Sequence, residues 1–279
     1  MRNDWVEVAD RVLVWRQPML NVNAVLVLGG AGALVVDTLS TPAQATELTE
    51  AIGRVTSLPW RVVNTHHHFD HTFGNAVLAP DAGTEVWAHV ECVDRFGRYT
   101  ANGVTAKIAE VAAEYASTLP DLAAEVAQLT GLRAPDHAVR DHATLDLGDR
   151  TVQLRHLGRG HTDNDLIVLV PDARTVLAGD LVEDGTPPSF EDSWPLEWAG
   201  TVAALLELGP EVVVPGHGGA MPPAAVAAQH ADLVALEWAC REGWDSNASV
   251  TEVAAKAPFG VETASTAVER AYAFLDGRL

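Results

Sequence analysis

The chain has 279 residues, enough to bury a sizeable hydrophobic core in one large domain or two small ones. Its 18 Lys and Arg stand against 38 Asp and Glu, a formal net charge of −20. This charge disfavours a nucleic-acid or anionic-membrane partner, because phosphate binding needs clustered basic side chains. The two cysteines, Cys92 and Cys240, are too few for a disulfide framework or a thiolate zinc cluster.

The N-terminal segment predicts a protein of the cytoplasm. Residues 1–5 are polar, and alternating residues follow them instead of the apolar core of a signal peptide. The longest apolar runs, such as 166–170, are far shorter than the roughly 20 residues that cross a bilayer.

The first part of the chain predicts short strands, one helix and a helical insertion. Apolar patterns of strand type lie at 5–8, 11–15, 24–28, 33–37, 61–64 and 85–88. A helical pattern runs from Thr41 to Arg54, with Pro42 suited to its first turn. Helical spacing resumes at His89, and a stretch near 99–132 that is rich in Ala and Glu predicts a helical insertion.

The second part returns to strands and ends in helices. Strand patterns lie at 143–147, 151–156, 166–170, 175–178 and 212–214. One helix is expected at about 194–208, and the C-terminal 60 or so residues are mostly helical in pattern. This order predicts an α/β sandwich and a single domain over residues 1–279.

A dense group of metal-type side chains follows the predicted strand at 61–64. It comprises His66, His68, Asp70 and His71. Side chains alternate along a strand, so the His-x-His pair can direct both imidazoles to one side, while Asp70 and His71 fall on the turn beyond. Zn²⁺ favours imidazole and carboxylate ligands and needs three or four of them. Chance produces this spacing on the order of once per thousand such sequences, so the group predicts a metal site.

Three further segments carry a metal-type side chain just after a predicted strand. These residues are His161, Asp180 and His217, each in or beside a glycine-containing loop. Taken singly, such a residue is structural in roughly two cases of three, so their weight comes from their combination with the first group.

The complete set resembles the metallo-β-lactamase superfamily in both motif and order: His66-x-His68-x-Asp70-His71, then His161, Asp180 and His217. The resemblance runs from the opening strands to His217. It implies a four-layer αβ/βα sandwich, with a helical insertion near 99–132, a helical C-terminus and a dinuclear metal site between two sheets.

The resemblance also implies how the ligands divide between two divalent ions per chain. His66, His68 and His161 would bind the first ion. Asp70, His71 and His217 would bind the second ion, and Asp180 would bridge the two. Zn²⁺ is the first expectation, with Mn²⁺ or Fe²⁺ as alternatives, because His and Asp ligands also hold these metals and availability decides.

This donor set favours hydrolysis. Two close cations lower the pKa of a shared water and stabilise the oxyanion that follows attack. The expected reaction is attack by a metal-bridging hydroxide on a small ester, thioester or lactone, and the resemblance implies a catalytic Asp70 that shuttles the proton to the leaving group. True β-lactamases of this fold usually carry Cys or Ser where Asp180 stands, so the glyoxalase-II and lactonase side is favoured. A β-lactam-hydrolysing enzyme and a catalytically silent metal-binding or scaffold member stay open as alternatives.

The loop after Asp180 offers candidate substrate contacts. Phe190 and Trp194 lie in it, although Trp194 and Trp198 are spaced for packing of a helix on a sheet. The insertion near 99–132 leaves three roles open: a lid over the site, the surface of a homodimer, or core packing alone. The expected partner is a small-molecule substrate, with no nucleic acid and no membrane.

Overall fold

The computed structural model describes residues 4–279, which form two compact units. The first unit holds residues up to 156 together with 168–173, and the second holds 157–167 and 174–279. The predicted single domain stays a prediction, and each unit is considered by itself. Residues 1–3, on which part of the signal-peptide argument rests, lie outside the described residues.

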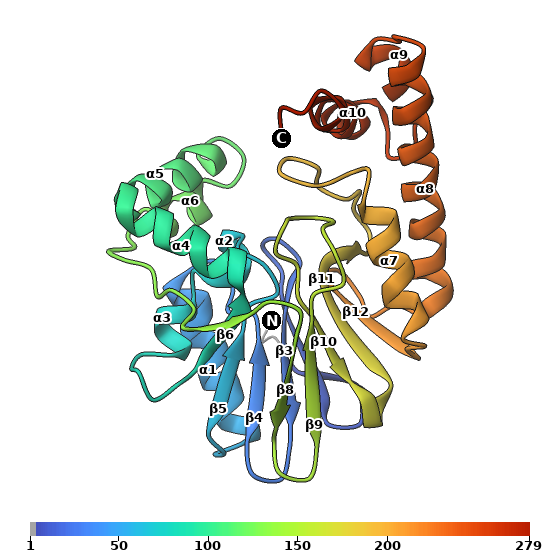
Figure 1. Cartoon of the computed structure of the whole chain (residues 1–279). Coiled ribbons are helices and arrows are strands. Elements are labelled where there is room, and N and C mark those ends of the chain that lie inside the picture. The colour runs from blue at the N-terminus through green and yellow to red at the C-terminus, as the bar shows by residue number, and fades with distance from the viewer. Residues whose placement is uncertain (1–3) are drawn as a thin grey trace. The chain divides into compact units, whose positions relative to one another are not determined.

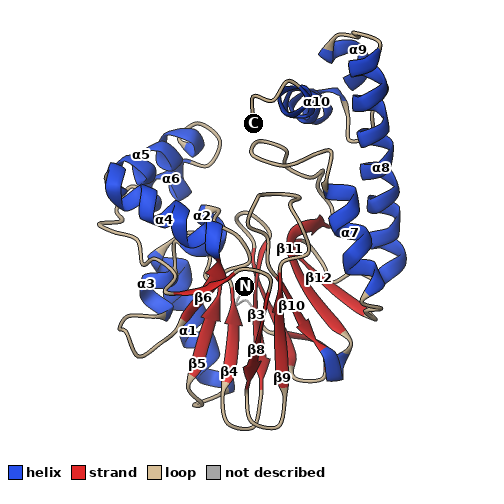
Figure 2. Cartoon of the chain, in the orientation of Figure 1, coloured by secondary structure: helices blue, strands red, loops and turns tan. Residues whose placement is uncertain are grey.

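The first unit is built on a mixed sheet (Figure 2). Its strands are β1 (Val6–Ala9), β2 (Val12–Gln17), β3 (Val22–Leu28), β4 (Ala33–Val36), β5 (Trp60–Val63), β6 (Val86–His89) and β7 (His137–Val139). Strands β1 to β4 pair antiparallel, whereas β4 to β7 pair parallel. Parallel neighbours need a crossover connection, and helices follow β4, β5 and β6 to supply it.

The described residues of this unit form the helices α1 (Pro42–Val55), α2 (Phe69–Thr72), α3 (Asn75–Leu78), α4 (Val90–Asn102), α5 (Val104–Tyr115) and α6 (Pro120–Val126). Helix α1 begins as predicted, because the Thr41 hydroxyl accepts a hydrogen bond from Gln44 N–H at 3.2 Å. It buries Leu48 and Ile52 against the sheet residues Val35 and Val62. The helical stretch predicted from His89 is α4, and the helical insertion predicted near 99–132 is confirmed as α5 and α6, which lie with α4 beyond the end of β6 (Figure 1).

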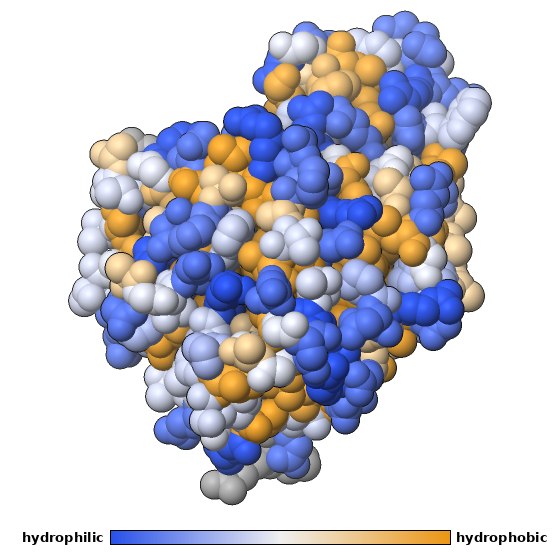
Figure 3. All heavy atoms as spheres, turned by 60° about the horizontal axis from the view of Figure 1, so that its bottom comes forward, coloured by the Kyte–Doolittle hydropathy of each residue, from blue (hydrophilic) through white to orange (hydrophobic). Residues whose placement is uncertain are grey.

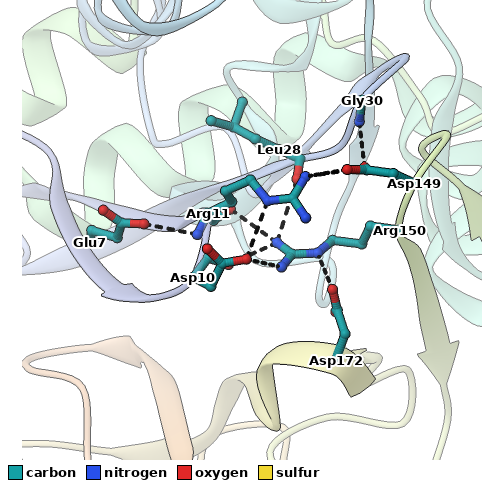
Figure 4. A network of polar contacts seen from close by, with 8 residues as sticks. All are labelled: Glu7, Asp10, Arg11, Leu28, Gly30, Asp149, Arg150 and Asp172. Carbon is teal, nitrogen blue, oxygen red and sulfur yellow. Dashed lines mark hydrogen bonds and ion pairs between the residues drawn. The ribbon is translucent and has the colours of Figure 1, made fainter.

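Strands β8 (His142–Asp146) and β9 (Thr151–Arg155) form an antiparallel hairpin whose turn contains residues 148 and 149. Directly after this turn, Arg150 carries a side chain that is 0% exposed. Its guanidinium donates to the Asp10 carboxylate at 2.9 Å, to the Asp10 carbonyl at 2.8 Å and to the Asp172 carboxylate at 2.8 Å (Figure 4). Asp172 lies in the short 3-10 helix η1 (Pro171–Ala173). The buried guanidinium therefore ties the hairpin to the β1–β2 turn and to η1.

Replacing Arg150 with methionine is expected to lower the free energy of unfolding by about 3 kcal/mol, because the Asp10 carbonyl and the Asp10 and Asp172 carboxylates lose a charged donor that is itself buried. Chemical denaturation monitored by circular dichroism measures this change. The matched control is Arg174→Met, since Arg174 pairs with Glu211 in an ion pair whose side chains are 61% and 62% exposed. The control is expected to change stability by under about 1 kcal/mol, and equal losses in both variants would contradict the assigned role of Arg150.

The second unit pairs a two-stranded parallel ribbon with helices. Strands β11 (Thr175–Glu183) and β12 (Val212–His217) pair parallel, and β10 (Ile167–Val170) lies at the boundary of the units. The helices are α7 (Trp198–Glu207), α8 (Pro223–Asp245), α9 (Val250–Ala254) and α10 (Val261–Leu275). Helix α7 connects β11 to β12, and α9 and α10 lie at the C-terminal end of α8 (Figure 1).

Three expectations for the second unit need correction. The strand predicted at 175–178 continues to Glu183, and the one predicted at 212–214 continues to His217. Asp180 and His217 therefore lie within strands and do not follow them. The helix predicted from 194 begins at Trp198, because residues 194–197 form a turn in which Trp194 C=O accepts from the Glu197 and Trp198 N–H groups.

Among residues 4–279, no helix combines the length and the apolar character needed to cross a membrane. Hydrophilic residues are spread over the face seen in Figure 3, with apolar residues between them. Cys92 and Cys240 are both buried.

Candidate metal centre

The first unit brings together four of the predicted ligands just after β5. The ring centroid of His66 lies 4.7 Å from that of His68 and 4.3 Å from that of His71. Asp70 Oδ2 lies 3.6 Å from His71 Nε2. The short helix α2 places Asp70 and His71 next to each other, and His68 is its N-cap residue. His66, Asp70 and His71 are buried, and His68 is half-buried.

A buried carboxylate orients two of these imidazoles. Asp37 Oδ2 lies 2.8 Å from His71 Nδ1 and accepts the Thr65 hydroxyl, also at 2.8 Å. Since a carboxylate accepts, His71 carries its proton on Nδ1 and a lone pair on Nε2. The Thr65 oxygen lies 3.0 Å from His66 Nδ1. Its own proton goes to Asp37, so His66 Nδ1 donates to it and His66 Nε2 carries the lone pair. Both rings are thus held in the tautomer that a metal ligand needs.

The pKa of the Asp37 carboxyl is raised above its ordinary value, with burial as the largest cause. The His71 ring, the Thr65 N–H and the Thr65 hydroxyl act on this pKa in the opposite direction. The carbonyl of His71 is held in turn, because it accepts from Thr38 N–H and from Asn64 Nδ2, each at 3.0 Å.

These supporting residues were not predicted. Asp37 ends the predicted strand at 33–37 and has φ 64°, a left-handed conformation that is uncommon outside glycine. The one signal in the sequence that could have identified Asp37 is its position as an acidic residue at the carboxyl end of a buried strand. Thr65 and Asn64 are adjacent to the histidine group, but nothing in the sequence shows which partners they bond.

Replacing Asp37 with asparagine is expected to weaken metal binding about 10- to 100-fold, because His71 and Thr65 lose the charged acceptor that orients them. Titration of the metal-free protein with Zn²⁺, followed by calorimetry, measures this affinity. Asp232→Asn is the matched control, since Asp232 is exposed on α8. Wild-type affinity in Asp37→Asn would show that His71 needs no carboxylate behind it.

The second unit brings together the other three predicted ligands around one carboxylate oxygen. Asp180 Oδ2 lies 3.5 Å from His161 Nε2 and 3.4 Å from His217 Nε2. Tetrahedral Zn²⁺ with bonds of about 2.0–2.1 Å separates its ligand atoms by roughly 3.3 Å. Both spacings therefore match ligands that share an ion, and the donor set of imidazole and carboxylate fits a divalent metal.

Strand β12 leaves space for the Asp180 carboxylate because the residue at position 216 is glycine. A Cβ at Gly216 would lie 1.7 Å from Asp180 Oδ1. Asp180 itself follows Gly179, which has φ 53° and sits where the pairing of β11 with β12 shifts register. Gly216 therefore allows the carboxylate to lie against the neighbouring strand, next to His217.

The loop that carries His161 is fixed by hydrogen bonds on its C-terminal side. Asp165 accepts from Thr162 N–H at 2.9 Å and from the Thr162 hydroxyl at 2.6 Å. On the other side of His161, Gly160 C=O accepts from Trp194 N–H at 2.8 Å. His161 is held between these two anchors.

The two candidate substrate contacts have packing partners within the second unit. Phe190 is buried, with its ring centroid 5.2 Å from that of Trp198 and 5.7 Å from that of Phe259. The Arg159 guanidinium stacks 3.6 Å above the Trp194 ring. These contacts do not support a substrate role for Phe190, and both assignments stay predictions.

Comparisons with known proteins agree with the motif. The family model described as "Metallo-beta-lactamase superfamily" matches residues 18–217, which include all seven predicted ligands. A metallo-beta-lactamase type 2 from Bacteroides fragilis is 28% identical over 136 residues, 47% of this chain and 50% of that protein. One from Bacillus cereus is 28% identical over 102 residues, 35% of this chain and 40% of that protein. This chain thus spans half or less of these curated relatives.

Solved structures show the same fold at lower identity. A metallo-beta-lactamase from Pontibacter korlensis has a TM-score of 0.63 at 19% identity, covering 83% of this chain and 99% of that one. A double mutant of a sec-alkyl sulfatase has a TM-score of 0.78 at 16% identity, covering 99% of this chain and 51% of that one. The predicted α/β sandwich is confirmed.

Proposed function

Because this chain belongs to the metallo-beta-lactamase superfamily, we propose that it is a dinuclear metal-dependent hydrolase that cleaves a small ester, thioester or lactone. The observation that carries the proposal is the position of Asp180, whose Oδ2 lies within 3.5 Å of the Nε2 atoms of both His161 and His217. A carboxylate between two imidazoles suits a ligand shared by two ions.

The proposed centre combines ligands of both units. His66, His68 and His161 would hold one ion, and Asp70, His71 and His217 the other, with Asp180 between them. That the two ligand sets bind the same pair of ions is part of the proposal. The donor chemistry of five imidazoles and two carboxylates supports Zn²⁺, with Mn²⁺ and Fe²⁺ as alternatives.

When bound, two divalent ions supply an activated water and polarise the substrate carbonyl. The residues of the chain would hold the ions, orient the ligands and transfer the proton. Asp180 would be the shared ligand, and Asp37 orients the His71 ring. Asp70, which is 7% exposed and lies beside His71 Nε2, would carry a proton to the leaving group.

One observation favours a second substrate class. Curated relatives at 28% identity are metallo-beta-lactamases by name, so a β-lactam is the alternative substrate. A catalytically silent metal-binding member is the alternative from another class, and complete ligand sets in both units argue against it. The proposal also includes a cytoplasmic location, a small-molecule substrate, and neither nucleic-acid nor membrane partners. A homodimer that uses the insertion near 99–132 as its interface is tested by measuring the mass of the protein in solution.

A hydrolysis panel tests the proposal. The purified protein is loaded with Zn²⁺, Mn²⁺ or Fe²⁺ and offered p-nitrophenyl esters, lactones, thioesters, phosphodiesters and a chromogenic cephalosporin. Metal-dependent cleavage of an ester, thioester or lactone is expected. Cleavage of the cephalosporin alone would establish the alternative substrate, cleavage of phosphodiesters alone would replace the proposal, and no cleavage by the metal-loaded protein would favour the silent member.

A further inference from the structure

Glu183 lies at the end of β11, next to two of the predicted ligands, and has no part in the function proposed above. We propose that Glu183 is an additional metal ligand, which completes the position held by Asp180 and His217. This inference rests on the proposed function, since it adds a donor to the same centre.

The three side chains form a ligand group within the second unit. Each of Asp180, Glu183 and His217 offers a ligand atom, and these atoms all lie within 4.8 Å of one another. Donors on opposite sides of a six-coordinate ion with bonds of 2.0–2.1 Å lie about 4.2 Å apart. The group therefore needs only a small side-chain adjustment to bind one ion.

An irregularity in the strand pairing explains why Glu183 is near Asp180. In a regular strand, residues three apart point to opposite faces. The pairing of β11 with β12 shifts register between Gly179, which lies opposite Pro215, and Glu183, which lies opposite His217. Extra residues in one strand bend it and re-aim its side chains, and here they bring the Glu183 carboxylate back beside Asp180.

Backbone contacts hold this segment in place. Asp184 N–H donates to His217 C=O at 3.2 Å, and Gly219 N–H donates to the Asp184 carboxylate at 2.8 Å. Glu183 N–H donates to the amide oxygen of Gln229, a buried residue of α8, at 3.0 Å. The residues on both sides of the ligand group are thus tied together, and the position of Glu183 is fixed opposite His217.

A second carboxylate beside Asp180 changes which ion this position prefers. Carboxylate oxygens suit Mn²⁺ and other oxygen-preferring ions, whereas imidazole suits Zn²⁺. With Asp180 and Glu183 both present, the position is expected to accept Mn²⁺ or Fe²⁺ more readily than an imidazole-rich position does.

The experiment compares Glu183→Gln with the wild type in the full-length chain. The metal-free proteins are titrated with Mn²⁺ and followed by electron paramagnetic resonance, and bound Zn²⁺ is counted by elemental analysis after dialysis. Glu183→Gln is expected to weaken one of two Mn²⁺ equivalents at least about tenfold and leave the other within about twofold. Glu183→Asp, which keeps the carboxylate, is expected to recover part of the affinity. Glu191→Gln, on an exposed residue of the following loop, is the control with wild-type binding.

Wild-type Mn²⁺ affinities in Glu183→Gln, or equal weakening of both equivalents, would overturn the inference. Loss of the second equivalent in Glu191→Gln as well would also overturn it. Failure of the proposed function looks different, because the wild type itself would then bind fewer than two ions. If the wild type binds two ions and Glu183→Gln does the same, only the role of Glu183 is lost.

Discussion

Replacing Asp180 with alanine is expected to reduce turnover by about 1,000-fold or more, which corresponds to about 4 kcal/mol of lost transition-state stabilisation. The carboxylate oxygen lies 3.5 Å from His161 Nε2 and 3.4 Å from His217 Nε2. Its loss therefore removes the proposed metal ligand that lies next to both imidazoles. The same variant is expected to retain about one ion or less per chain, because the remaining ligands no longer enclose two positions. Steady-state kinetics and elemental analysis measure the two effects.

The matched control for this variant is Asp245→Ala, at the exposed C-terminal end of α8. Circular dichroism establishes that both variants are folded. Unchanged turnover in Asp180→Ala would reject the proposed hydrolase mechanism, and retention of two ions would reject Asp180 as a shared ligand.

Replacing Gly216 with alanine is the second change with a large expected effect. The added Cβ would lie 1.7 Å from Asp180 Oδ1 and 2.9 Å from Asp180 Cγ, much closer than atoms can approach. Either the carboxylate moves away or the end of β12 shifts. We expect metal affinity to fall at least about 10-fold, the range seen when a partner that orients a ligand is lost, and turnover to fall with it.

Gly200→Ala is the control for this substitution. Gly200 lies in α7, and an added Cβ there meets no atom within 4 Å. Alanine in a helix interior is favoured over glycine by up to about 1 kcal/mol, so this variant is expected to be more stable and fully active. Normal metal binding in Gly216→Ala would show that Asp180 does not depend on the bare backbone of Gly216.

The candidate ligands could be identified from the sequence because their signal is local. His66, His68, Asp70 and His71 occur within a few residues of a predicted strand, and His161, Asp180 and His217 follow in the order that the resemblance implies. Strands β1 to β6 were predicted for the same reason, since hydrophobic patterns of four to seven residues determine them, whereas the three-residue strand β7 was not predicted.

The residues behind the ligands could not be predicted, because their partners are distant in the chain. Asp37 is 34 positions from His71, and only the folded sheet brings their side chains to 2.8 Å. The same holds for the end of β11. A pattern of alternating residues cannot show a register shift, so the predicted strand ends at 178. For the same reason the sequence does not predict that Glu183 lies near Asp180.

Short elements and tertiary packing account for the remaining differences. Helices α2 and α3 have four residues each, too few for a helical period to be recognised. Phe190 is buried against Trp198, a tertiary contact on which sequence spacing gives no information, and its role as a substrate contact stays a prediction.

The metal content of the wild-type chain tests the central claim most directly. The protein is stripped with a chelator, reconstituted with excess Zn²⁺, dialysed and analysed for metal per chain by elemental analysis. Seven ligands from His and Asp side chains predict about two tightly bound ions per chain. About one ion per chain or fewer would contradict a dinuclear centre and with it the proposed function.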